Sequence, residues 1–123
     1  MELTGKCKED FEKWYINTHF SKSIDDESIK YHIRSFNHSR LPSEKWGVFE
    51  DFFASHNIFF QRWSTFYKDG INQEWQILIY DKTEKYLYGK QSTASYGDNH
   101  EYPTPMDARL GTIKKANKIY NGE

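Results

Sequence analysis

One short run late in the chain holds the residue types best suited to chemistry. Asp98 and His100 lie within residues 98–101, and a carboxylate beside an imidazole can act as an acid–base pair. Polar loops often contain such residues, so a solvated loop tip is the simpler interpretation. Cys7 would be a nucleophile only if a histidine oriented it, and the sequence places none beside it. Its place on an apolar helical stripe favours a small core residue.

The motif search predicts neither a metal nor a cofactor. The five histidines are scattered, and the closest candidate pair, His32 and His38, is six residues apart, which suits neither a helical nor a strand ligand pair. The chain has no Walker loop, GxGxxG, HExxH or EF-hand pattern. We therefore expect a protein that is not an enzyme.

Basic and aromatic residues alternate in two regions, which is typical of a binding surface. From Ser28 to Ser43 the chain has no acidic residue, and basic and aromatic side chains alternate there. Such surfaces bind single-stranded nucleic acid, and Trp, Tyr and Arg are also enriched at the centres of protein interfaces. The candidate partner-binding residues are Lys30, Tyr31, Arg34 and Arg40 in this stretch, and Arg62, Trp63, Tyr86 and Tyr88 on expected strands.

The apolar periodicity predicts three clear helices that would position these residues. Residues 5–19 have an apolar face at the helical period with Thr4 as a possible cap, and residues 43–56 have a wide aromatic face. Thr104, Pro105 and Asp107 are typical of a capped helix start, with Asn121 at its end. The segment 20–41 is the least regular, although ESIKYHIRSF within it could form a short helix.

Residues 58–90 predict a three-stranded antiparallel meander, because short turns join three β-favouring runs. Asp69-Gly70 is a hairpin signal, and Asp81 begins a second turn. In the third strand, alternation places Tyr86 and Tyr88 on one face. The polar residues 91–103 predict a long loop. The expected fold is a small single α+β domain over residues 1–123, ordered α-(α)-α-β-β-β-α, with helices packed on the sheet.

Aromatic residues dominate the apolar content. Nine tyrosines, nine phenylalanines and four tryptophans occur in a chain whose mean hydropathy is −0.94. Periodicity explains many of these rings as core, but not eight of them: Tyr31, Phe36, Trp63, Tyr67, Tyr86, Tyr88, Tyr96 and Tyr102. The sequence leaves open whether those eight rings face solvent, and those that do are the first candidates for contact with a partner.

Charge and hydropathy predict a soluble cytoplasmic protein. The net charge is −1, so no global field attracts nucleic acid or an anionic membrane. The start of the chain has no apolar stretch typical of a signal peptide, and no apolar run approaches the 18 residues of a membrane span.

Three segments together resemble a group of small phage and prophage proteins of unassigned function. They are LTGKCKEDFEKWY, LPSEKWGVFEDFFASHNI and DARLGTIKKANKIYN, and members of the group share an LTGK–FEKWY opening, a WGVY–DFF middle and an EAR–AIEKANELYN end. This chain departs from the pattern at residues 21–40 and 91–103. The resemblance implies phage origin and action in a bacterial host, and it carries over no catalytic residue.

Two functions remain open from the sequence and this resemblance. The first is non-catalytic binding that inhibits a host defence protein or ribonucleoprotein, in the manner of an anti-CRISPR protein. The alternative is a single-stranded RNA- or DNA-binding accessory protein that uses the same basic and aromatic residues.

Overall fold

The computed structural model describes residues 3–20, 25–66, 73–88 and 104–123, without the side chains of residues 39, 42, 62–66 and 73–76. The elements are α1 (Gly5–His19), α2 (Asp26–Ser39), α3 (Pro42–Ser55), β1 (Phe59–Phe66), β2 (Gln73–Tyr80), β3 (Tyr86–Tyr88) and α4 (Pro105–Tyr120). This order confirms the α+β class and the antiparallel meander, with strand order β1-β2-β3. The Asp69-Gly70 turn lies outside the described residues.

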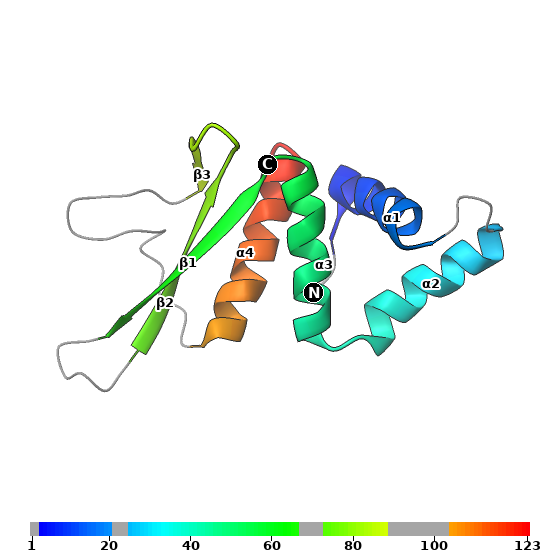
Figure 1. Cartoon of the computed structure of the whole chain (residues 1–123), viewed down its shortest axis with the longest axis horizontal. Coiled ribbons are helices and arrows are strands. Elements are labelled where there is room, and N and C mark those ends of the chain that lie inside the picture. Colours follow the sequence, from blue (N-terminus) through cyan, green and yellow to red (C-terminus); the bar gives the residue numbers. More distant parts are fainter. Residues whose placement is uncertain (1–2, 21–24, 67–72, 89–103) are drawn as a thin grey trace.

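The elements form layers rather than one set of helices on a sheet. Figure 1 shows α4 and α3 between the sheet and the pair α1 and α2. α4 lies against β2 and α3 against β1, whereas α1 packs on the other three helices. The face of the sheet that meets the helices includes Phe60, which contacts the rings of Trp46 and Phe53 in α3.

Local signals explain most helix boundaries. The Thr104 hydroxyl accepts a hydrogen bond from the Asp107 backbone N–H at 3.1 Å, which confirms the predicted cap of α4. α3 begins with Pro42 in its first turn, and Asn57 follows it with φ of 63°, a left-handed geometry that asparagine tolerates. The helix expected at ESIKYHIRSF, residues 27–36, is present as α2. It has 14 residues and is therefore longer than predicted.

The sequence pattern predicts an apolar stripe on α4 made of Met106, Leu110, Ile113 and Tyr120, and Ile113 is buried as expected, but small side chains share the packing with it. Ala108, Thr112 and Ala116 are fully buried, and they follow one another at four-residue intervals. By contrast, 42% of Leu110 is exposed, although it was expected on the buried stripe. Small side chains allow the helix axis to approach its neighbours closely.

The two ends of the described chain are joined by two asparagines of the C-terminal segment. Asn121 accepts from the Cys7 backbone N–H at 2.8 Å and donates to the Thr4 carbonyl at 2.9 Å. Asn117 accepts from the Thr4 N–H and donates to its hydroxyl, both at 2.9 Å. Thr4 was expected to cap α1 with its own side chain, but its side chain makes no capping hydrogen bond. Asn121 instead accepts from the Cys7 backbone N–H in the first turn.

Gly5 is needed where these contacts form. Its φ is +59°, and a Cβ at this position would lie 3.2 Å from the Asn121 side-chain oxygen. Glycine therefore provides both the left-handed backbone and the close approach.

We expect Asn121→Ala to destabilise the fold by about 1–3 kcal/mol, because it leaves the Cys7 backbone N–H without its partner and removes one of the two donors to the Thr4 carbonyl. Urea unfolding followed by circular dichroism measures this change. Asn17→Ala, at an exposed position of α1, is the control and should change stability by less than about 0.5 kcal/mol. Equal stability of the Asn121 variant and the wild type would contradict the prediction.

Candidate functional site

The candidate site is the outward side of α2, which we call the α2 basic face. It comprises Lys30, Tyr31, Arg34 and His38, with Arg40 directly after the helix, and all five are exposed. The first four recur at helical intervals over roughly 12 Å of helix axis. The exposed fraction of Tyr31 is 64%, so this ring faces solvent. The face therefore combines positive charge with one exposed aromatic side chain.

The N-terminus of α2 is defined locally. The Asp25 side chain accepts a hydrogen bond from the Ser28 N–H at 2.7 Å, which lowers the pKa of the Asp25 carboxyl. Asp26 and Glu27 occupy the first turn, where negative charge suits the helix dipole. Acidic residues therefore stay at the start of the helix, and the basic residues occupy its middle and end.

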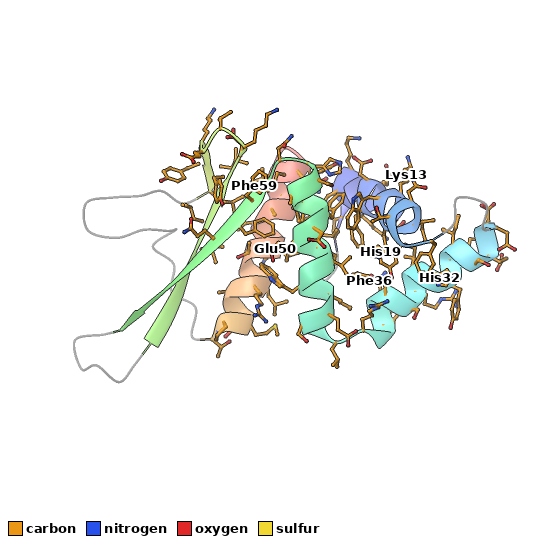
Figure 2. The ribbon with its side chains drawn as sticks, in the orientation of Figure 1. Lys13, His19, His32, Phe36, Glu50 and Phe59 are labelled. Atoms are coloured by element: carbon orange, nitrogen blue, oxygen red, sulfur yellow. The ribbon has the colours of Figure 1, made fainter. Side chains whose placement is uncertain are left out.

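The inner side of α2 is fixed by aromatic contacts. Phe36 is 1% exposed, and its ring centroid lies 4.9 Å from that of Tyr15, 5.4 Å from Phe11 and 5.5 Å from Phe49. Figure 2 shows Phe36 directed from α2 toward α1 and α3. Phe36 is therefore a core residue, which the periodicity of the sequence did not indicate. Its burial determines which side of α2 points outward.

A second contact holds the first half of α2. The His32 ring stacks on Phe20 with centroids 3.9 Å apart and planes 23° apart. His32 therefore packs between the helix and the end of α1, while His38 is exposed on the outer side. The two histidines therefore have different surroundings.

The cations of the α2 basic face form no ion pair with any described residue. The ion pair that the structure describes joins Lys6 to Asp10 at 3.1 Å, on α1. Lys30, Arg34 and Arg40 are thus a local excess of positive charge on a chain of net charge −1. Such a patch attracts anionic groups over about a Debye length.

The sheet residues of the prediction are not brought together in the same way. β1 pairs Arg62 with Ile77 and Trp63 with Gln76, so these two positions belong to opposite faces of the sheet. Their side chains are outside the description. Both faces are covered at the middle of β2, because Ile77 is fully buried and Leu78 is 2% exposed.

The two tyrosines of β3 also have different surroundings. A register irregularity pairs Tyr88 with Ile79 and Tyr86 with Tyr80, which are on opposite faces of β2. Tyr88 packs against the core, with the Lys115 Nζ 5.1 Å from its ring centroid, whereas Tyr86 is 41% exposed. The α2 basic face, and not the sheet, is therefore the coherent part of the predicted site.

Cys7 and Tyr120 take part in the packing and hydrogen bonding of the fold. Burial, with a smaller effect from Asp10, raises the pKa of the Cys7 thiol to about 12. The Tyr120 hydroxyl donates to Asp10 at 2.7 Å, which lowers the pKa of Asp10, and burial raises the pKa of Tyr120. Asp98 and His100 lie outside the described residues, and no group of metal-binding side chains occurs within the described ranges.

A cleft between α3 and α4 was not predicted from the sequence. It has a volume of about 80 Å³ and is lined by Lys45, Trp46, Phe49, Met106, Arg109, Leu110 and Ile113. Trp46 and Leu110 were both assigned to core stripes, so periodicity gave no signal for a cleft. Leu110 remains partly exposed because small residues make the closest contacts of α4.

Comparisons with known proteins identify no relative. No family model, curated protein or solved structure matches the chain. None of the described helices is long and apolar enough to cross a membrane.

We expect Phe36→Ala and Tyr31→Ala to differ sharply although both remove a ring from α2. Phe36→Ala should cost about 3–5 kcal/mol of unfolding free energy, because it leaves a cavity in the core. Tyr31→Ala should cost less than about 0.5 kcal/mol, because the ring is exposed. Chemical denaturation of both variants measures the difference. Comparable losses would mean that α2 is docked differently.

Proposed function

We propose that this protein is a phage-encoded binding protein that inhibits a bacterial defence protein or ribonucleoprotein in the host cytoplasm without catalysis. The α2 basic face carries the proposal, because its cations have no described partner within the chain and its tyrosine is exposed. The resemblance to small phage proteins supports the bacterial setting. The structural roles of Cys7 and Tyr120 support binding rather than chemistry.

A protein surface fits this face better than a single strand of nucleic acid. Single-strand binders combine a basic groove with several stacking rings, whereas the α2 basic face offers the Tyr31 ring and the His38 imidazole. The face spans about 12 Å and ends beside Asp25 and Asp26, which would repel a continuing phosphate backbone. The partner should therefore present a compact acidic patch.

The test is capture of a partner from bacterial lysate by immobilised protein. Lys30→Glu with Arg34→Glu should reduce capture by about tenfold or more, because like charges would then oppose each other at the contact. Lys82→Glu with Lys114→Glu makes the same charge change at exposed sites in the turn after β2 and on α4, and this variant should retain capture.

The same experiment distinguishes a nucleic-acid partner. If the target is a protein, treatment of the lysate with nuclease should leave capture intact. The captured protein should bind to the immobilised protein again after it has been purified. Equal capture by both double variants would contradict the proposed surface, and complete loss after nuclease treatment would favour nucleic acid.

A further inference from the structure

Arg109 presents an unusual group on the wall of the cleft between α3 and α4. Its Nε atom is buried and has no hydrogen-bond partner in the described structure. The guanidinium carbon lies 5.9 Å from the centroid of the Trp46 ring. A guanidinium remains charged at all ordinary pH values, and an unsatisfied buried donor is costly. Arg109 as a whole is partly exposed and lines the cleft, so its positive charge is available to an anionic group that enters the cleft.

The remainder of the cleft is apolar. Trp46 and Phe49 of α3 face Leu110 and Ile113 of α4 across it. One water needs roughly 10–15 Å³ in the same measure, so a cleft of about 80 Å³ has room for a branched aliphatic side chain. Interface hot spots have this form, with an apolar anchor in a pocket and polar groups around it.

Lys45 gives the cleft a second cation and connects it to α2. Its Nζ donates to the Asn37 carbonyl of α2 and lies 6.0 Å from the Phe36 ring centroid. The ammonium group is therefore held at the junction between the cleft and the end of α2. Figure 1 shows that the first turns of α3 and α4 lie at the same end of the helical layer as the last turn of α2.

We propose that this cleft receives an apolar side chain from an acidic segment of the protein partner, with a neighbouring carboxylate bound by Arg109. The inference rests on the proposed function, in which the partner is an acidic protein surface. The α2 basic face and the cleft then form one continuous contact, in which α2 attracts the acidic segment and the cleft fixes its register.

The probe is the peptide acetyl-Glu-Glu-Leu-Glu-Glu-amide, titrated into the whole protein labelled with ¹⁵N. The shifts should centre on the Trp46 indole N–H and the Arg109 Nε–H. Replacing the leucine with serine should weaken binding about tenfold, because the apolar anchor is lost. Replacing the four glutamates with glutamines should weaken it by a similar factor of about ten, because the charge-assisted hydrogen bond is lost.

Two variants locate the site. Leu110→Glu should abolish the shifts, because it places a carboxylate at the mouth of the cleft. Gln61→Glu makes the same charge change at an exposed position of β1 and should leave them unchanged. Both variants should keep the wild-type circular dichroism spectrum.

Several outcomes would overturn the inference. Absence of shifts at Trp46 and Arg109, equal binding of the glutamine peptide, or full binding by the Leu110→Glu variant would each do so. Failure here is separable from failure of the proposed function. The peptide could fail to bind while capture of the partner still depends on Lys30 and Arg34. That result would support the proposed function and confine the contact to α2.

Discussion

The packing around Phe11 is the constraint on which the helical half of the molecule depends. Its ring lies 5.4 Å from Phe36 of α2, 5.1 Å from Phe49 and 5.3 Å from Phe52 of α3, measured between centroids. A single side chain of α1 thus joins three helices. Aromatic pairs of this kind contribute about 0.5–1.5 kcal/mol each beyond their buried area. These rings form the core together with buried aliphatic side chains, which include Leu3, Ile16, Ile58, Ile79 and Ile113.

Three segments that are far apart in the sequence meet around this core. Residues 3–15 hold Phe11, residues 41–58 hold Phe49, and residues 107–121 hold Asn121, which binds the start of α1. α2 is attached to these segments by the buried ring of Phe36. Its other side is exposed and carries the positive charge of Lys30 and Arg34.

The sequence predicted what depends on local rules, and it missed what depends on distant neighbours. Helical periods, the α4 cap and the order of the strands follow from adjacent residues. The contact between Asn121 and Thr4 spans almost the whole chain, so no local pattern reveals it. Ala108 was not part of the apolar stripe that the sequence predicts for α4, although it is fully buried. The sequence predicts the basic stretch that contains Lys30. It does not predict that this stretch faces outward, because its orientation depends on the rings that bury Phe36.

The orientation of α2 is the central claim, and hydroxyl-radical footprinting of the free protein tests it most directly. Tyr31 and Tyr15 have the same intrinsic reactivity, but they are 64% and 3% exposed. The account predicts rapid labelling of Tyr31 and strong protection of Tyr15, whose ring is covered partly by Phe36. Similar labelling of the two tyrosines would show that α2 does not pack on α1 and would contradict the account.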